Sequence, residues 1–311
     1  MKYYIGVDGG GTKTQYALFD EKKNMLSTVK TGGTNHENLD GAIPEAAGIL
    51  MNGINELLLK NALRQEEVSF ILMALAGMDH PYQEAELSDA LKACGLTIPF
   101  ALYNDGFIVV KAGASGKAGI GYNCGTGTCC NSVDNDENLL QVGGFGPLSG
   151  DVGGGVWIAG RVFRMVYDDV CLRARKTSCT RAVCEHFEIP ETREGVLSLI
   201  SKLEETDDRT VRDMIDIFFD AFNAGDPAAV DVGVEMAQRG AEFIAAHLKN
   251  GNFTDETVEV VLSGSIHTKL PSDVYIANLH ERAEALSGRK LKFIKLTVPP
   301  VTGCINWILE K

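Results

Sequence analysis

Three consecutive glycines follow an aspartate close to the start of the chain, in the run DGGGTKT at residues 8–14. The backbone amides of a glycine turn can approach phosphate oxygens closely, because no Cβ stands in the way. The spacing differs from that of a P-loop, which leads into a helix, since residues 15–19 predict a strand. We interpret the turn as a phosphate-binding loop, with an ordinary hairpin turn as the alternative. The residues assigned to it are Asp8, Gly10, Gly11, Thr12 and Lys13.

Two further glycine turns stand later in the chain. Gly125, Thr126 and Gly127 lie between two predicted strands of the second half, at the point that corresponds to the first turn. Gly264 and Ser265 lie where a predicted strand passes into a helix, a place where backbone can approach a nucleotide. Two facing glycine hairpins can enclose a polyphosphate, so the three turns together predict a nucleotide site more strongly than any one of them.

The elements that must position these turns alternate between strands and helices. In the first part of the chain, strands are predicted at 3–7, 15–20, 25–31, 69–75 and 100–103, the first three as a meander. Helices are predicted after Asp40, which we expect to cap the first of them, at 82–94 and after Asp105. Apolar residues three or four positions apart in the first helix indicate a face that lies on a sheet. This alternation is typical of an α/β domain.

The pattern repeats from Gly119 onward. Strands are predicted at 120–123, 128–133, 139–142, 258–262 and 291–296, with a mostly helical stretch at 150–250 and a last helix after Pro299 and Pro300. The repetition predicts an internal duplication, with two related sheet halves and a cleft between them. We expect domains at residues 1–117 and 118–311.

Composition limits the kinds of binding partner and the cellular compartment that we expect for this protein. Acidic residues exceed basic ones, 42 against 29, for a net charge of −13, which disfavours nucleic acid and anionic membrane surfaces as partners. The longest apolar stretch, 70–78, is far shorter than the about 20 residues that span a bilayer. The eight cysteines have no zinc-like spacing, and no export signal precedes Asp8. A cytoplasmic protein fits these features best.

The motifs of the chain, taken in order, resemble those of the N-acetylglucosamine kinase and BadF/BadG/BcrA/BcrD-type ATPase family, within the sugar kinase, Hsp70 and actin superfamily. The resemblance covers nearly the whole chain and implies an actin-like (ribonuclease H-like) fold of duplicated βββαβαβα domains around a nucleotide cleft. The matching motifs are DGGGTKT at 8–14, TNHENL at 34–39, NDG at 104–106, CGTGT at 124–128, GGFGPLSGDVGGGVWIAGR at 143–161, AGDP at 224–227, LSGSI at 262–266 and PPVTG at 299–303.

The resemblance implies specific roles in phosphate transfer from ATP. Asp8 acts on Mg²⁺ through water, and Thr12, Thr126 and the glycine amides hold the ATP phosphates. Asp105 looks like the family's catalytic carboxylate, which accepts the proton of the attacking sugar hydroxyl. A helix-capping aspartate is the alternative for Asp105, and the two roles are compatible.

The same resemblance implies a sugar-binding set. Carboxylate and amide groups suit vicinal hydroxyls, and an aromatic ring can cover a sugar face or an acetamido methyl group. Phe145 is equally able to plug a core, and a histidine at position 36 is as typical of a surface loop as of a ligand. The residues of this set are Asn35, His36, Asp105, Thr128, Cys129, Gly144, Phe145, Gly146 and Asp151.

The leading interpretation is an ATP:N-acetylhexosamine kinase, expected to be a homodimer, that phosphorylates O6 of N-acetylglucosamine. Many members have Asp-Glu-Gly-Ser where this chain has DVGG at 151–154, SGTGS where it has CGTGT at 124–128, and Trp in place of Phe145. These departures affect the sugar pocket, so N-acetylmuramic acid, glucosamine, another hexose and transfer to O1 remain alternatives.

Two classes other than a sugar kinase compete with this interpretation. The first is an ATP-driven activator of a dehydratase or reductase, which holds a [4Fe–4S] cluster between subunits. The resemblance of this chain to such activators is weak at the cluster-binding positions. Residues 125–127 lie in a predicted hairpin, and Cys171, Cys179 and Cys184 lie in helical sequence. The second is a nucleotide-dependent sensor, which would not need the sugar-binding carboxylates Asp105 and Asp151.

Overall fold

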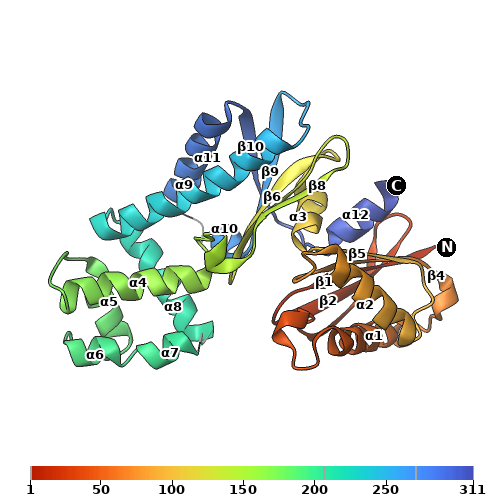
Figure 1. Ribbon diagram of the computed structural model, residues 1–311, viewed down its shortest axis with the longest axis horizontal. Helices are drawn as coiled ribbons and strands as arrows, with labels where there is room; N and C mark the ends of the chain where they lie inside the picture. The colour runs from red at the N-terminus through yellow and green to blue at the C-terminus, as the bar shows by residue number, and fades with distance from the viewer. Residues whose placement is uncertain (1, 206–207, 270–271, 311) are drawn as a thin grey trace. The chain divides into compact units, whose positions relative to one another are not determined.

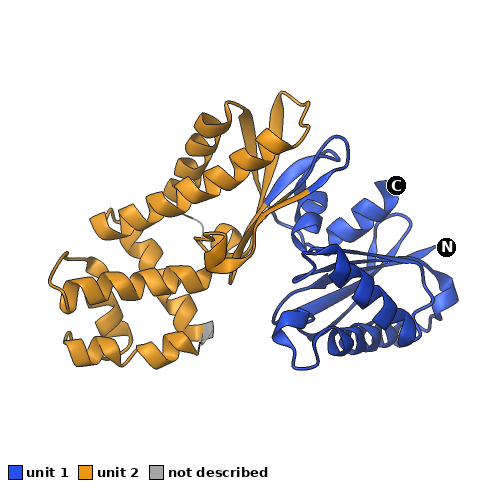
Figure 2. Ribbon diagram, in the orientation of Figure 1, with its two compact units in different colours: residues 1–121, 132–139, 296–311 blue, residues 122–131, 140–295 orange. Residues whose placement is uncertain are grey.

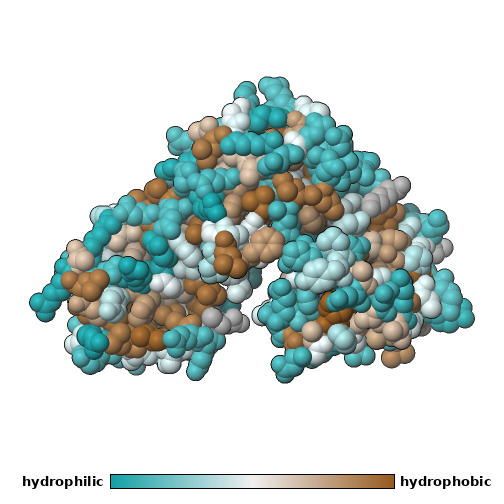
Figure 3. All heavy atoms as spheres, viewed as in Figure 1, coloured by the Kyte–Doolittle hydropathy of each residue, from teal (hydrophilic) through white to brown (hydrophobic). Residues whose placement is uncertain are grey.

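The computed structural model describes residues 2–205, 208–269 and 272–310 and separates into two compact units (Figure 2). Unit 1 comprises residues 1–121, 132–139 and 296–311, and unit 2 comprises residues 122–131 and 140–295. None of the helices in the described ranges has the length and apolar character needed to cross a bilayer. Polar side chains cover much of the visible face of each unit (Figure 3).

Unit 1 is built on a five-stranded sheet in the order β3-β2-β1-β4-β5. Its strands are β1 (Tyr3–Gly9), β2 (Lys13–Asp20), β3 (Met25–Gly32), β4 (Val68–Leu75) and β5 (Phe100–Tyr103). The first three form the predicted antiparallel meander, while β4 runs parallel to β1 and β5 parallel to β4. The carboxyl ends of β1, β4 and β5 therefore meet at one edge of the sheet.

Helices cover both faces of this sheet, because alternate strand residues point to opposite sides. On one face α1 (Ala42–Lys60) and α2 (Pro81–Ala93) lie side by side (Figure 1) and bury a core that includes Ile5, Val7 and Leu50. On the other face α3 (Gly106–Gly113) and α12 (Thr302–Glu310) bury a second core. Two short 3₁₀ helices, η1 (His36–Asn38) and η2 (Gln65–Glu67), complete the described helices of this unit.

The start of α1 differs from the expected one. We expected Asp40 to cap this helix, but Gly41 stands at the N-cap and makes no side-chain hydrogen bond. Glu45 takes over part of that role, since its Oε2 accepts the N–H of Gly41 at 2.8 Å. The predicted apolar face is confirmed, with Ile43, Leu50 and Ile54 all buried.

A second five-stranded sheet repeats the topology of the first, in the order β10-β9-β6-β7-β8. Its strands are β6 (Gly119–Cys124), β7 (Thr128–Val133), β8 (Leu139–Gly143), β9 (Thr257–Ser263) and β10 (Lys290–Lys295). Read from the other end, β8-β7-β6-β9-β10 corresponds strand by strand to β3-β2-β1-β4-β5. The predicted internal duplication is confirmed.

The expected helical stretch lies between β8 and β9, as the rainbow colouring shows (Figure 1). It contains η3 (Gly146–Leu148), α4 (Gly155–Val170), α5 (Ser178–His186), α6 (Arg193–Leu197), α7 (Ile200–Glu204), α8 (Asp208–Asn223) and α9 (Pro227–Asn250). After β9 come α10 (Ser265–Thr268) and α11 (Asp273–Ser287), which packs along α9.

The bounds of the compact units differ from the domain bounds that we expected from sequence. The end of the chain, from residue 296 on, belongs to unit 1 instead of the C-terminal part. The reason is packing, because α12 contacts α3, β1 and β4, and Cys304 and Ile305 of this helix join a core of unit 1 together with Val301 just before it.

Candidate active site

Three aspartates gather at the carboxyl edge of the parallel strands of unit 1. Asp8 is the last residue but one of β1, Asp105 follows β5, and Asp79 follows β4. Since β4 lies between β1 and β5, the strand order places Asp79 in the middle of the set. Sequence reasoning missed Asp79, although it follows a predicted strand just as Asp105 does.

The other two carboxylates influence the protonation of Asp105. Burial raises the pKa of Asp105 to about 7, and the negative charges of Asp8 and Asp79 add to this effect. Burial likewise raises the pKa of Asp8 to about 6, against the lowering influence of Lys13. A carboxylate with a pKa near the working pH is suited to accept a proton in general base catalysis.

A hydrogen-bonded chain holds the backbone on both sides of Asp105. Asn104 Nδ2 donates to Asp79 Oδ1 at 3.0 Å, and the N–H of Gly106 donates to Asn104 Oδ1 at 2.9 Å. Asp105 occupies the N-cap position of α3, but its side chain makes no capping hydrogen bond. The capping alternative for Asp105 is therefore wrong, and the side chain of Asn104 satisfies the first turn in its place.

The first glycine turn of unit 1 is fixed by backbone contacts and is exposed at its tip. The N–H of Gly10 donates to Lys13 O at 3.0 Å, and the N–H of Thr34 donates to Gly10 O at 3.1 Å. The hydroxyls of Thr34 and Thr14 lie 2.9 Å apart beneath the turn. Gly11, Thr12 and Lys13 are exposed, so the turn offers its backbone at the edge that carries Asp8.

Asn35 and His36 lie beside the same edge, tied to the start of α2. Asn35 Oδ1 accepts the N–H of Glu37 at 3.0 Å and so caps η1. His36 Nε2 lies 3.3 Å from Gln83 Nε2, and because an amide nitrogen only donates, the ring nitrogen accepts. Gln83 Oε1 in turn accepts the N–H of Asp79 at 2.9 Å. His36 is thus half-buried against α2 instead of lying free on a surface loop.

The aspartates of unit 1 fit a Mg²⁺ ion that is held mostly through water. In the described ranges no three His, Cys, Asp or Glu side chains are arranged to enclose a metal ion. Mg²⁺ does not require such an enclosure, since it keeps several waters and uses one or two carboxylates together with substrate phosphates. Burial raises the pKa of both Asp8 and Asp105, and a cation beside them would favour their charged forms.

The second glycine turn, in unit 2, connects β6 to β7 as predicted and packs on the start of α4. The N–H of Gly125 donates to Gly127 O at 2.9 Å, and the N–H of Gly155 donates to Gly125 O at 2.8 Å. The hydroxyl of Thr128 donates to Val152 O at 3.1 Å. Thr128 is buried, and its hydrogen bond joins the turn to the segment after Asp151.

Gly264, in the third glycine turn, lies against the second turn at Cys124 and Gly125. Its φ of +82° lies in the left-handed region, and a Cβ there would collide with the carbonyl group of Cys124. Only glycine permits this approach, which sets Ser265 and α10 directly beside Gly125. The predicted second and third glycine turns are therefore neighbours in unit 2.

Asp151 organises the loop that carries the remaining predicted residues. Its Oδ2 accepts the N–H groups of Gly144 and Gly146, each at 2.8 Å, and its Oδ1 accepts the hydroxyl of Ser149 at 2.7 Å. Phe145 is 46% exposed, so its ring does not plug a core. Cys129 lies against Gly144, at the base of the loop.

Each unit thus groups its own share of the predicted residues. Unit 1 holds Asp8, Gly10, Gly11, Thr12, Lys13, Asn35, His36 and Asp105. Unit 2 holds Gly125, Thr126, Gly127, Thr128, Cys129, Gly144, Phe145, Gly146, Asp151, Gly264 and Ser265.

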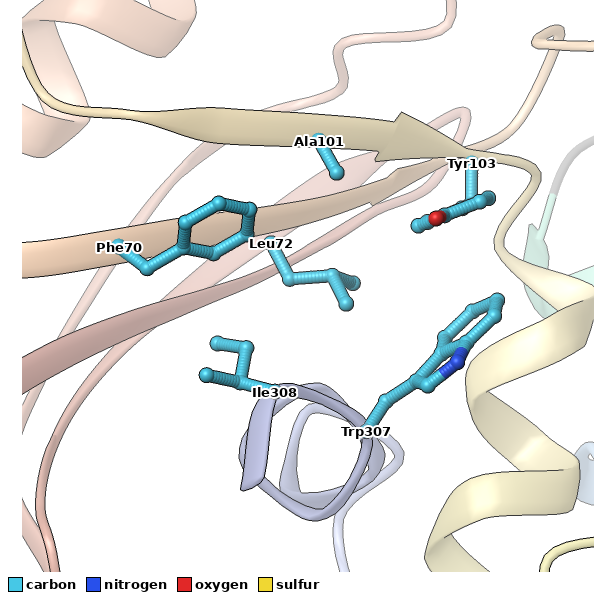
Figure 4. A pocket seen from close by; sticks show the side chains of 6 residues that line it. All are labelled: Phe70, Leu72, Ala101, Tyr103, Trp307 and Ile308. Carbon is cyan, nitrogen blue, oxygen red and sulfur yellow. The ribbon is translucent and has the colours of Figure 1, made fainter. Parts of the chain in front are cut away.

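An apolar pocket of about 210 Å³ in unit 1 is not part of this site. Phe70 and Leu72 of β4, Ala101 and Tyr103 of β5, and Trp307 and Ile308 of α12 line it (Figure 4). The rings of Tyr103 and Trp307 stack at 4.2 Å between centroids. The lining offers no charged group to a phosphate, and the pocket lies on the face of the sheet that α12 covers.

Two sheets of identical topology, each with a glycine turn at its strand ends, define the class as duplicated actin-like α/β domains. The chain belongs to the BadF/BadG/BcrA/BcrD ATPase family, whose sequence model matches residues 5–283. The expected fold class and family are both confirmed.

The curated relatives of the chain are sugar kinases. Over 194 residues it is 27% identical to an N-acetyl-D-glucosamine kinase of Dictyostelium discoideum, and over 177 residues 29% identical to an N-acetylmuramic acid/N-acetylglucosamine kinase of Clostridium acetobutylicum. The aligned parts span 60% of this chain and of the first relative, and 57% of this chain and of the second.

Solved structures confirm the fold along the whole chain. A provisionally named N-acetylglucosamine kinase of Chromobacterium violaceum has a TM-score of 0.67 at 16% identity, with 98% of each chain covered. A ROK family glucokinase of Streptomyces griseus, solved with glucose and AMPPNP, has a TM-score of 0.54 at 15% identity, with 98% of this chain and 97% of that chain covered. At these identities the likeness concerns the fold alone.

Proposed function

We propose that the protein is an ATP-dependent kinase that transfers the γ-phosphate of ATP to O6 of an N-acetylhexosamine, with N-acetylglucosamine as the first acceptor and N-acetylmuramic acid as a second. The observation that carries the proposal is Asp105. It stands at a strand end beside a glycine turn, makes no capping hydrogen bond and has a pKa raised to about 7. The names of the curated relatives support the choice of acceptor.

In this mechanism Asp105 accepts the proton of the attacking hydroxyl. The O6 oxygen forms a bond to the γ-phosphorus, the bond from that phosphorus to the bridging oxygen breaks, and ADP leaves. Asp79 and Asn104 hold the backbone around Asp105, so the base keeps its position during the transfer. Asp8 would hold Mg²⁺ through water, and the ion would supply positive charge that offsets the phosphates.

The glycine turns bind the nucleotide. Gly10, Gly11, Thr12 and Lys13 of unit 1 offer an exposed backbone turn and a cationic side chain to the phosphates. Gly125, Thr126 and Gly127 of unit 2 do the same, and Gly264 with Ser265 takes the adenosine. Lys13 adds attraction for phosphate in a protein whose net charge is −13.

Each unit contains residues that we propose for sugar binding. Asn35, His36 and Asp105 belong to unit 1, and Thr128, Cys129 and the loop from Gly144 to Asp151 belong to unit 2. Phe145 is exposed on that loop and covers the acetamido methyl group or a face of the ring. We also propose that the protein acts as a homodimer in the cytoplasm, where ATP and free amino sugars are available.

The test is sugar-dependent release of ADP. Purified protein with Mg·ATP is incubated with N-acetylglucosamine, N-acetylmuramic acid, glucose or no sugar, and ADP and product mass are recorded. A phosphosugar of matching mass, whose fragments place the phosphate on O6, supports the proposal. ADP release that is independent of sugar contradicts it and favours an ATPase activator, for which iron analysis of anaerobically purified protein is the next measurement.

A further inference from the structure

The loop from Gly143 to Asp151 in unit 2 is exposed but tightly tied. The side chain of Leu148 is 98% exposed at its tip. Inside the loop, the N–H of Phe145 donates to Ser149 Oγ at 3.1 Å and the N–H of Gly150 donates to Pro147 O at 3.1 Å. These hydrogen bonds and those of Asp151 fix the shape of the loop, but they do not fix the loop to the rest of the unit.

Arg239 on α9 provides an anchor outside the loop. Its Nη2 donates to Ser149 O at 2.6 Å and its Nε to Gly150 O at 3.0 Å. These two carbonyls belong to the residues that immediately precede Asp151. One side chain from a long helix therefore fixes the backbone from which Asp151 projects.

The guanidinium group is itself held from two further directions. Its Nη1 donates to Glu242 Oε2 at 2.8 Å, and its carbon lies 4.8 Å from the ring centroid of Phe243. Phe243 is buried beneath Gly143, where a Cβ would approach the ring to 2.8 Å. The planar guanidinium fork presents donors in a fixed geometry to two carbonyls and a carboxylate, whereas the ammonium group of a lysine is a point charge on a flexible stem.

We infer that Arg239 is a positioning residue for the amino-sugar site, which acts by holding the Asp151 loop in its binding shape before sugar arrives. The inference rests on the proposed function, since it assigns the loop to the sugar. Neither Arg239 nor α9 contributes to the residues proposed for ATP. A loop that is ordered in advance loses less conformational entropy on binding, so its anchor contributes to sugar affinity.

The experiment compares sugar binding with ATP binding in the full chain. Titration calorimetry with N-acetylglucosamine in the absence of ATP gives the sugar Kd, and steady-state kinetics give KM for each substrate. Arg239→Ala is expected to weaken sugar binding about tenfold and to leave KM for ATP within about twofold, because charged hydrogen bonds to two carbonyls are lost. Arg239→Lys is expected to fall between Arg239→Ala and the wild type.

Two controls separate positioning from general stability. Glu235→Gln removes an ion pair of the same helix, that between Glu235 and Arg161 at 2.8 Å, and leaves the loop contacts intact, so sugar Kd is expected to stay unchanged. Millimolar guanidinium chloride added to Arg239→Ala is expected to restore sugar affinity, which a loss of folding alone would not allow. If Arg239→Ala does not fold, Arg239→Lys is measured in its place. A raised sugar Kd with KM for ATP unchanged supports the inference, and an unchanged sugar Kd contradicts it.

The outcomes are distinguishable. If the wild type binds no amino sugar and releases no sugar-dependent ADP, the proposed function fails. If the wild type binds sugar and the Arg239 variants bind it equally well, or if sugar and ATP weaken together without rescue by guanidinium, the inference fails while the proposed function stands.

Discussion

Asp105, Asp79 and Asn104 illustrate how the candidate site depends on single side chains. Asp105 stands before a helix, but its carboxylate accepts no capping hydrogen bond, and Asn104 Oδ1 accepts the N–H of Gly106. Asp79 Oδ1 accepts a hydrogen bond from Asn104 Nδ2. The carboxylate of Asp105 is thereby left available for chemistry, and its surroundings raise its pKa to about 7.

Replacement of the proposed base is the first prediction at this scale. Asp105→Asn is expected to lower kcat by about 10²–10⁴, the usual contribution of general base catalysis, with ATP affinity nearly unchanged because the glycine turns remain intact. Steady-state kinetics and nucleotide titration measure the two quantities. Turnover close to that of the wild type would remove Asp105 from the mechanism.

The same variant is expected to be more stable at alkaline pH. A carboxyl whose folded pKa is raised favours folding below its unfolded pKa, near 3.8, and loses that contribution as pH rises through about 7. Asp105→Asn has no such loss, so its melting temperature should exceed that of the wild type by a few degrees at pH 8 and by less at pH 5. Thermal melts at both pH values test the sign, and an equal difference at both contradicts it.

The pH dependence of catalysis tests the carboxylate cluster. Because the base must be deprotonated, kcat/KM for the sugar is expected to rise with pH through about 7 and then to level off. Asp79→Asn keeps an acceptor for Asn104 but removes a negative charge, so the midpoint should move to lower pH. A midpoint that is unchanged in Asp79→Asn would show that the charge of Asp79 does not act on Asp105.

At the scale of elements, close backbone packing shapes the glycine turns of unit 2 that we propose for the nucleotide. The turn between β6 and β7 lies against the first residues of α4 and against Gly264 before α10. None of these contacts involves a large side chain. Glycines at the three places allow strand ends and helix starts to meet, and they leave backbone amides near the surface.

Gly264→Ala tests this packing. The substitution is expected to destabilise the protein by about 2 kcal/mol or more, from a left-handed φ and a collision with the carbonyl of Cys124, and to weaken ATP binding. Gly288→Ala is the matched control, since Gly288 also has a left-handed φ, +67°, but open space for a Cβ. Denaturant unfolding and nucleotide titration should show the larger loss in Gly264→Ala, and equal losses would count against the packing argument.

At the scale of the whole molecule, the last helix of the chain completes unit 1. Lys111 of α3, almost fully buried, donates to Glu310 Oε2 at 2.6 Å and to Lys117 O at 2.8 Å, and it lies 5.6 Å from the ring centroid of Trp307. The pair joins α12 to the helix that begins after Asp105. Residues nearly 200 positions apart in sequence thus stabilise one core.

Glu310→Ala tests this link. Removal of one partner leaves the buried ammonium group uncompensated, which is expected to cost about 2–3 kcal/mol of unfolding free energy, somewhat less than for a pair with both partners fully buried. Urea unfolding of the variant measures the loss. A variant that unfolds at the same urea concentration as the wild type would mean that Lys111 finds its stabilisation elsewhere.

The sequence by itself determined the strands, the glycine turns, the duplication and most of the candidate residues. These features are encoded locally, in apolar periodicity and in glycines at turns, so the ranges 100–103 and 128–133 match the observed strands residue for residue. Asp8 was recognisable as an acid at a predicted strand end, whereas Asp105 was assigned through the resemblance of NDG at 104–106 to the family motif.

Only the tertiary structure decided which distant residues support the site. The sequence predicted Asp40 as a helix cap, passed over Asp79 and gave no signal for Arg239, because each of these roles depends on side-chain hydrogen bonds. The bonds of Asn104 to Asp79 and of Arg239 to Ser149 join residues 25 and 90 positions apart. Such contacts follow from strand order and helix packing, which local sequence patterns do not specify.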